Sequence, residues 1–174
     1  MRRSVAVVGA LLASIMLVGA NVASLAVHGA QAQEVRTKGD ERVVPNVMVQ
    51  ATLRFTPGKI KVQSGESVTW IHDDFTTAPH TVTVVEEFPE ATLDAVFACG
   101  APGGPCDVAL TAHFATFPPT PVVEAGAPGL DAPGDSLFLA DDQSITATVT
   151  APSGTTLRYL CAIHPWMQGE IAVN

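Results

Sequence analysis

Apolar and polar residues alternate in two parts of the chain, before residue 86 and after residue 136. Alternation with a period of two, in short runs rich in β-branched residues, is typical of half-buried β-strands. The strands expected on this basis are Val47–Phe55, Ile60–Val62, Val68–His72, His80–Val85, Ile145–Thr150, Thr156–Leu160 and Glu170–Val173. Because turn-forming residues separate these runs and no convincing amphipathic helix interrupts them, the pattern predicts an all-β fold, an antiparallel Greek-key β-sandwich.

The alternating pattern breaks down between residues 86 and 136. Glycine and proline are frequent there, for example in Gly100–Pro105 and in Pro118-Pro119-Thr120-Pro121. A loop of this length is unusual inside a compact domain. We therefore expect an ordered but irregular insertion, which packs through its aromatic residues Phe97, Phe114 and Phe117.

Residues 1–32 have the features of an export signal. Met1-Arg2-Arg3 is a basic start, Val5–Val27 contains no charged residue, and Ala30-Gln31-Ala32 offers a small-x-small cleavage site. This predicts export to the periplasm or the extracellular space. The apolar run is also long enough to span a bilayer, so an uncleaved membrane anchor remains an alternative. Residues 33–45 are polar and lack periodicity; we interpret them as a flexible linker before one domain, residues 46–174, that contains the insertion.

Export changes how the three cysteines are interpreted. Outside the cytosol cysteines are expected to pair, and an odd one is left for other chemistry. Cys99 and Cys106 flank a Gly/Pro-rich turn segment that can bring them together, so we predict a disulfide between them. Closing so short a loop stabilises the fold by about 2.5 kcal/mol in the chain-entropy model. Cys161 is then the unpaired cysteine.

The formal net charge is −8 at pH 7, and the predicted signal carries arginines but no acidic residue, so the mature chain is more acidic still. This charge argues against nucleic-acid binding and against attraction to anionic membrane surfaces. Membrane association is expected only if the N-terminal segment is uncleaved. The acidity fits a partner with a basic docking surface, or simply a solvated surface that keeps an exported protein soluble.

Candidate metal ligands occur in the run Tyr159–Gly169, where Cys161, His164 and Met167 are spaced three residues apart. Thiolate and thioether ligands favour copper, and a trigonal site of two His and one Cys with a long, weak Met is the blue-copper electron-transfer site. Such a site needs a second histidine from elsewhere. His80, at the start of an expected strand, is the candidate.

These residues lie in two motifs that resemble the cupredoxins, small copper proteins of the plastocyanin, amicyanin and halocyanin type. The motifs are Phe55-x-Pro57-x-x-Ile60-x-Val62-x-x-Gly65-x-x-Val68-x-Trp70 with Pro79-His80, and Tyr159-x-Cys161-x-x-His164-Pro165-x-Met167-x-Gly169-x-Ile171-x-Val173. The short spacing from Cys to Met is similar to that of amicyanin. The resemblance covers residues 46–85 and 136–174 but not the insertion. It implies one type 1 copper ion, Cu(I) or Cu(II), held by His80, Cys161, His164 and Met167.

The resemblance also implies roles for neighbouring residues. His164 would be the exposed ligand through which electrons pass, within an apolar patch that includes Pro165 and Trp166; an ordinary core position is the alternative for Trp166. Thr81 would tie the two ligand segments together by hydrogen bonding, and Pro165 would stiffen the ligand loop by fixing φ. Gly169 is expected to permit the turn into the last strand.

The remaining histidines are interpreted as non-ligands. His72 falls in a strand pattern and is expected at the surface or at a sheet edge. His113 lies within the insertion, and His28 belongs to the predicted signal.

Together these features predict an exported carrier of single electrons that serves redox protein partners. A copper-binding protein for storage, delivery or resistance is the alternative, but such proteins often use clusters of Met or His, and the sequence has none. An enzyme is not expected. Multicopper oxidases need further copper centres built from His-x-His pairs, which the sequence lacks, and a lone type 1 site has no open coordination position for a substrate.

Overall fold

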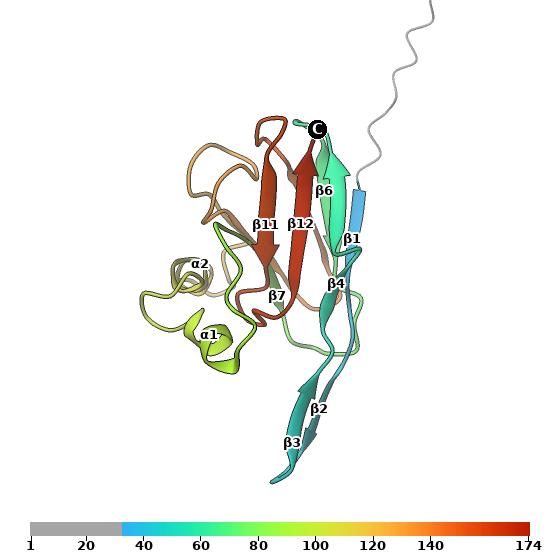
Figure 1. Ribbon diagram of the computed structural model, residues 1–174, viewed down its shortest axis with the longest axis vertical. Coiled ribbons are helices and arrows are strands. Elements are labelled where there is room, and N and C mark those ends of the chain that lie inside the picture. The colour runs from blue at the N-terminus through green and yellow to red at the C-terminus, as the bar shows by residue number, and fades with distance from the viewer. Residues whose placement is uncertain (1–32) are drawn as a thin grey trace, which may run out of the picture.

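In the computed structural model, which describes residues 33–174, two β-sheets pack against each other around a hydrophobic core (Figure 1). The predicted β-sandwich is therefore confirmed. Residues 1–32 lie outside the described part, and with them the predicted signal peptide and the alternative membrane anchor. Between residues 33 and 174, no helix is both long and apolar enough to cross a membrane.

The strands of each sheet come from distant parts of the chain. The four-stranded sheet has the order β10-β6-β1-β4, with bounds Ser144–Thr148, Ser67–Ile71, Gln33–Lys38 and Arg54–Thr56. The six-stranded sheet has the order β5-β12-β11-β7-β9-β8, with bounds Lys59–Val62, Gln168–Val173, Thr156–Leu160, His80–Val85, Ser136–Leu139 and Val122–Val123. Because β1 pairs with β6 and β5 with β12 in parallel, the sandwich is mixed rather than wholly antiparallel.

Tyr159 of β11 lies in the core between the two sheets. Its ring is fully buried, meets Trp70 edge-on with centroids 5.8 Å apart, and tilts against Phe55 at 5.0 Å. A Cβ atom at Gly169 would collide with this ring. Gly169 lies within β12 and has no positive φ, so it is needed for close packing and not, as expected, for a turn.

The interpretation of residues 33–45 as a flexible linker is wrong. Residues 33–38 form β1, an inner strand that pairs with β6 on one side and β4 on the other. Val35 and Thr37 point into the protein with 0% and 1% exposure. Only two residues of this strand, Val35 and Thr37, are fully buried, and one of them is polar. The alternation of apolar and polar residues was therefore too weak to predict the strand.

The rest of that segment belongs to a two-stranded antiparallel ribbon of β2 (Glu41–Val44) and β3 (Met48–Ala51). The ribbon extends away from the sandwich (Figure 1). The expected strand Val47–Phe55 therefore divides between this ribbon and β4. Val43, Val47 and Val49 on the ribbon are largely exposed.

The insertion contains two short helices that the sequence analysis did not expect, α1 (Leu93–Ala98) and α2 (Asp107–His113). Thr92 caps α1 by accepting a hydrogen bond from the amide of Ala95. The predicted disulfide between Cys99 and Cys106 is present and joins the two helices.

The expected packing of the insertion through its phenylalanines holds only for Phe114. Its ring is 52% exposed but meets Phe138 of β9 edge-on, with centroids 5.6 Å apart, whereas Phe97 and Phe117 are 72% and 96% exposed. The insertion also contacts the sheet through the buried disulfide, which packs with Leu160 and Ala162 at the end of β11.

Candidate metal centre

Three of the predicted ligands converge at one end of the sandwich. Nδ1 of His80 and Nδ1 of His164 are 3.2 Å apart, and Sγ of Cys161 lies 3.7 Å from the first nitrogen and 3.5 Å from the second. All three side chains are buried. They form a triangle of two imidazole nitrogens and one sulfur that could hold a metal ion.

Strand pairing brings these residues together across the sequence. His80 is the first residue of β7, and Cys161 follows the last residue of β11. The two strands are antiparallel neighbours, with Leu160 opposite Thr83, so the start of one and the end of the other lie at the same edge of the sheet. The loop between β11 and β12 lies at this end, beside α1 (Figure 1).

The loop that carries Cys161, His164 and Met167 is closed by its own backbone. The amide of His164 donates to the carbonyl of Cys161 at 3.1 Å, and the amide of Met167 donates to that of His164 at 2.8 Å. The amide of Cys161 in turn donates to the carbonyl of Met167 at 3.0 Å. Met167 is fully buried, as a ligand or a core residue would be. The three residues therefore stand on a constrained frame.

Burial sets the protonation states of the triangle. It lowers the pKa of His80 to about 4 and lowers the pKa of His164, so both imidazoles are neutral at pH 7. It raises the pKa of the Cys161 thiol to about 11, against the effect of backbone hydrogen bonds, first among them that from the amide of Thr81. Neutral imidazoles are the form that binds metals, whereas the thiol must lose its proton to become a ligand.

Behind His80 lies a carboxylate that the sequence analysis did not single out. Oδ2 of Asp74 is 2.8 Å from Nε2 of His80, and neither side chain is exposed. Because a carboxylate only accepts, Nε2 carries the ring proton and Nδ1 turns its lone pair to Cys161 and His164. Such a partner fixes the orientation of a ligand histidine and raises its basicity.

Asp74 is held as an anion by its own hydrogen bonds. Burial opposes its ionisation, but bonds from the hydroxyl of Thr37 and from the amide and hydroxyl of Thr76 outweigh it and keep the pKa of Asp74 below its usual range. Thr37 belongs to β1, the strand mistaken for a linker. Nothing in the sequence distinguishes Asp74 from the adjacent Asp73, which faces Arg36 and Lys38 at the surface.

His72 is not the surface or edge residue that we expected. Its side chain is 1% exposed, and its ring stacks on that of His80 with centroids 5.1 Å apart. Nε2 of His72 is 3.1 Å from the carbonyl of Ala78. The imidazole therefore closes the inner side of the site. His72, Asp74 and His80 also lie at metal-binding distances, but this group shares His80 and contains the Asp74–His80 hydrogen bond.

The outer side of the site is less open than expected. The side chain of His164 is only 8% exposed, and its Nε2 lies 3.7 Å from Oε1 of Glu41 on the β2–β3 ribbon. Pro165 is buried. Trp166 is 40% exposed, and its ring meets that of His164 at 5.3 Å between centroids. Trp166 is thus the exposed part of the predicted patch and not a core aromatic.

Thr81 connects the two ligand segments by hydrogen bonds, the role that the resemblance implied. Its amide donates to Sγ of Cys161 at 3.3 Å, and its hydroxyl accepts from the amide of Ala162 at 2.7 Å. The remaining histidine of the described part, His113, has both ring nitrogens in hydrogen bonds far from the triangle, to Thr120 and Ser136.

A metal ion fits this donor set. With bonds of about 2.1 Å to nitrogen and about 2.3 Å to sulfur, two ligands of one ion lie no more than about 4.4 Å apart. The three edges of the triangle are all shorter. Two imidazole lone pairs that face each other also repel unless a proton or a cation lies between them. One sulfur and two imidazoles, with a thioether nearby, are the donors that suit copper.

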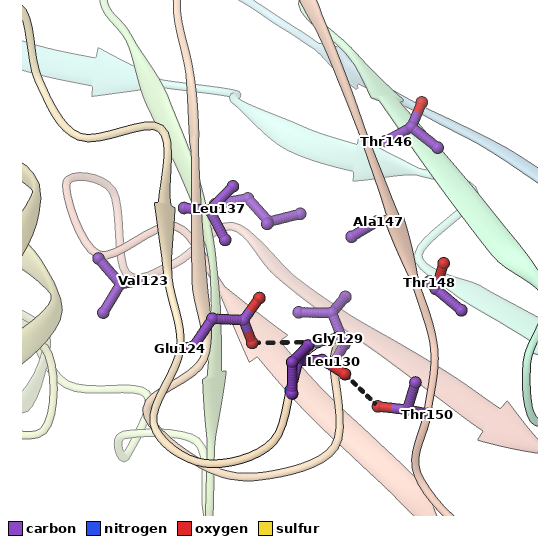
Figure 2. A pocket seen from close by; sticks show the side chains of 11 residues that line it. Val123, Glu124, Gly129, Leu130, Leu137, Thr146, Ala147, Thr148 and Thr150 are labelled. Carbon is purple, nitrogen blue, oxygen red and sulfur yellow. Dashed lines mark hydrogen bonds between the residues drawn. The ribbon is translucent and has the colours of Figure 1, made fainter.

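A hollow of about 390 Å³ lies elsewhere, between β8 and β10 (Figure 2). Its main polar groups already have partners: Glu124 accepts from the amide of Gly129, and the hydroxyl of Thr150 donates to the carbonyl of Pro128. No cluster of metal ligands of the described residues lies there. The hollow therefore offers no comparable chemistry.

No family model and no curated protein matches the chain. Among solved structures it is similar to a purple cupredoxin from Nitrosopumilus maritimus, with 15% identity over 82% of this chain and 99% of that one and a TM-score of 0.43. Auracyanin A, a "blue" copper protein from Chloroflexus aurantiacus, is 18% identical over 83% and 100%, with a TM-score of 0.43. Amicyanin from Paracoccus versutus is 16% identical over 83% of each chain, with a TM-score of 0.39. Since these TM-scores lie below 0.5, the site is assigned from its own side chains.

Proposed function

We propose that this protein is an exported type 1 copper protein that carries single electrons between redox partners. The proposed ligands are His80, Cys161, His164 and the axial Met167. The observation that carries the proposal is the triangle of Nδ1, Nδ1 and Sγ atoms, with edges of 3.2 to 3.7 Å, on a loop that also holds a buried methionine. Copper bound there would supply a one-electron couple.

The surrounding residues suit a carrier because they hold the ligands still. Asp74 fixes the ring of His80, Thr81 donates its amide to the sulfur of Cys161, and the loop of Met167 is closed by backbone hydrogen bonds. A centre that gains and loses one electron quickly needs ligands that do not rearrange, and pre-positioned supporting contacts provide this.

Storage or delivery of copper remains the alternative function. A store needs capacity and must release its metal. In residues 33–174 the second group of candidate ligands shares His80 with the first, so the described part offers one centre and no reservoir. We propose that the protein is not an enzyme, because a centre with this ligand set leaves no coordination position for a substrate.

We further propose that the redox partner docks over Trp166. This side chain is exposed, touches the ring of His164, and forms one side of an apolar groove with Val49, Leu93 and Phe97. With a net charge of −8, the protein favours a partner with basic residues around an apolar centre. Export is proposed from residues 1–32, and the mass of the mature chain tests it, since cleavage after Ala32 leaves Gln33 as the first residue.

The first test is the visible spectrum of the copper-loaded protein. We expect intense absorption from thiolate-to-copper charge transfer in the oxidised form, and its loss in Cys161→Ser. Met167→Leu should keep the metal but shift the potential. Met48→Leu, a change at an exposed methionine of the ribbon, should alter neither the copper content nor the potential. Retention of the absorption band in Cys161→Ser would refute the ligand assignment.

Proton release on binding provides an independent test. Because His80 and His164 are already neutral at pH 7 while the Cys161 thiol, with a pKa of about 11, is still protonated, binding of Cu(II) should release one proton per ion. Titration in weakly buffered solution measures it. Release of no proton would mean that the sulfur does not bind as a thiolate.

The choice between carrier and store is tested by voltammetry. A carrier keeps one copper per chain in both oxidation states and cycles reversibly. Stoichiometric loss of copper on reduction, or its transfer to an acceptor protein, would favour delivery. Trp166→Ala should slow electron exchange between protein molecules severalfold without moving the potential, whereas Phe117→Ala, which removes a more exposed ring in the insertion, should leave the rate unchanged.

A further inference from the structure

A buried chain of hydrogen bonds runs from the ligand loop to helix α2. The amide of Ala162 donates to Oγ1 of Thr81 at 2.7 Å, and the hydroxyls of Thr81 and Thr83 are 2.9 Å apart. The hydroxyls of Thr83 and Ser136 are 2.8 Å apart, and Ser136 lies 2.7 Å from Nε2 of His113. None of the four side chains is more than 1% exposed.

The fold assembles this chain from three separate elements. Thr81 and Thr83 lie on the same face of β7, and Ser136 of β9 is directly opposite Thr83. His113 is the last residue of α2 and comes from the insertion. Buried hydroxyls need partners, and here each one has a neighbour on both sides.

His113 determines the direction in which the chain donates. Its Nδ1 is 2.6 Å from the carbonyl oxygen of Thr120, which can only accept, so Nδ1 carries a proton. Burial lowers the pKa of His113, and a neutral imidazole has a single N–H. Nε2 is therefore an acceptor. Ser136 must donate to it, Thr83 must donate to Ser136, and Thr81 must donate to Thr83.

This direction matters because Thr81 lies beside the sulfur of Cys161. Its amide donates to Sγ at 3.3 Å, and its hydroxyl accepts from the amide of Ala162, the residue after Cys161, so the Thr81 side chain lies beside the cysteine. The hydroxyl has one proton, and the chain directs it to Thr83. If the chain ran the other way, Thr81 would accept from Thr83 and its own proton would be free to point at the sulfur.

We propose that His113 is a positioning residue for the metal centre: through Ser136 and Thr83 it keeps the hydroxyl proton of Thr81 turned away from the sulfur of Cys161. The consequence for the potential rests on the proposed copper function, whereas the direction of the chain does not. The chain begins at the backbone amide of Ala162, which does not ionise, so its role is to orient groups and not to relay protons.

The expected consequence is that the reduction potential of the wild type is lower than that of variants in which the chain is broken. A proton directed at the sulfur would stabilise the electron-rich reduced state, and hydrogen bonding around this sulfur is one of the factors that tune blue-copper sites. His113→Leu and Thr83→Val each allow the Thr81 hydroxyl to turn to Cys161. In both variants we expect the ratio of Cu(II) to Cu(I) affinity to fall by up to about tenfold, which corresponds to a rise of about 59 mV for a one-electron couple.

The metal-free protein tests the direction first. Nitrogen-15 chemical shifts of the His113 ring should show the Nδ1–H tautomer, and the amide of Ala162 should exchange slowly with solvent. Thr83→Val should leave the tautomer unchanged and speed the exchange of the Ala162 amide. Protonation of His113 on Nε2 in the wild type would overturn the proposal.

A double-mutant cycle then separates this role from a merely structural one. In a Thr81→Val background no hydroxyl remains beside the sulfur, so His113→Leu should no longer move the potential. If His113→Leu shifts the potential equally in both backgrounds, or not at all, the proposal is wrong. Should His113→Leu fail to fold, Thr83→Val serves in its place, compared with Thr83→Ser, which keeps the hydroxyl and should behave as wild type.

Thr111→Val is the matched control in the insertion, because it removes an exposed hydroxyl of α2 whose partner is Asp107 and not a member of the chain. It should change neither the potential nor the exchange of the Ala162 amide. If the wild type binds no copper, the proposed function fails, and the tautomer and exchange measurements still decide whether His113 sets the direction of the chain.

Discussion

The two histidines of the candidate centre stand in different surroundings. His80 is fully buried and donates to the equally buried Asp74 at 2.8 Å, with His72 stacked on its ring. His164 lies near the surface, and its carboxylate neighbour Glu41 is 3.7 Å away and 34% exposed. The imidazole–carboxylate pair of His80 is thus a buried hydrogen bond. The pair of His164 is a longer contact that is partly exposed to solvent.

The difference shows that burial and contact, and not charge alone, decide what a carboxylate does to a metal ligand. Water and salt screen Glu41, whereas nothing screens Asp74. The side of His80 and Asp74 should therefore set the copper affinity and the potential of the centre. The side of His164 and Glu41 should set how closely a redox partner can approach it.

Replacing Asp74 should have the largest effect. Asp74→Asn removes the acceptor that orients His80 and takes a buried negative charge away from the centre. Loss of such a partner typically costs 10–100-fold in metal affinity. We expect a fall of about this size for Cu(II), a smaller fall for Cu(I), and hence a higher potential, measured by competition titration and voltammetry.

Asp73→Asn is the matched control for this change. It removes the same charge from the neighbouring residue, whose side chain is 40% exposed and pairs with Arg36 and Lys38. We expect almost no change in copper affinity, since exposed ion pairs contribute little. Asp74→Glu, which keeps the carboxylate, should restore part of the affinity. Equal effects of Asp73→Asn and Asp74→Asn would show that only net charge matters.

Removing the support of Asp74 should have an intermediate effect. Thr37→Val keeps the shape of the side chain but removes hydrogen bonds with Asp74 and with the amide of Asp73. The free energy of unfolding should fall by about 1–3 kcal/mol and copper affinity by a few-fold. Denaturant unfolding and competition titration measure both, with Thr69→Val, at a hydroxyl pair on the exposed face of β6, as control.

The smallest effect is expected on the outer side. Glu41→Gln should change the affinity for Cu(II) by less than about twofold at physiological salt, where the Debye length is about 8 Å. The change should grow at low salt. Glu34→Gln is the matched control, because it removes the same charge from an exposed glutamate that pairs with Arg36 and not with His164. If Glu41→Gln matched Asp74→Asn in size, the contrast between the two sides would be lost.

The sequence alone identified the residues of the triangle, because ligand chemistry depends on residue type and the spacing of Cys161, His164 and Met167 is local. It also gave the strands β7 and β11 at their observed bounds and the disulfide between Cys99 and Cys106. These features depend on short-range patterns of side chains, which can be recognised without knowing the fold.

The contacts around the triangle could not be found in this way. Asp74, Thr37 and Glu41 are ordinary polar residues in the sequence, and the segment that holds two of them resembled a linker. Only the pairing of β1 between β6 and β4 buries Thr37 against Asp74, and only the ribbon brings Glu41 to His164.

What the sequence determined was which atoms can bind a metal, since that is a property of each side chain. What the tertiary structure decided was how those atoms are protonated, oriented and exposed. His113 illustrates the division: its residue type permits either tautomer, and the carbonyl of Thr120 selects one. The physical reason is that burial and hydrogen-bond direction depend on neighbours that are distant in sequence, and the fold alone chooses those neighbours.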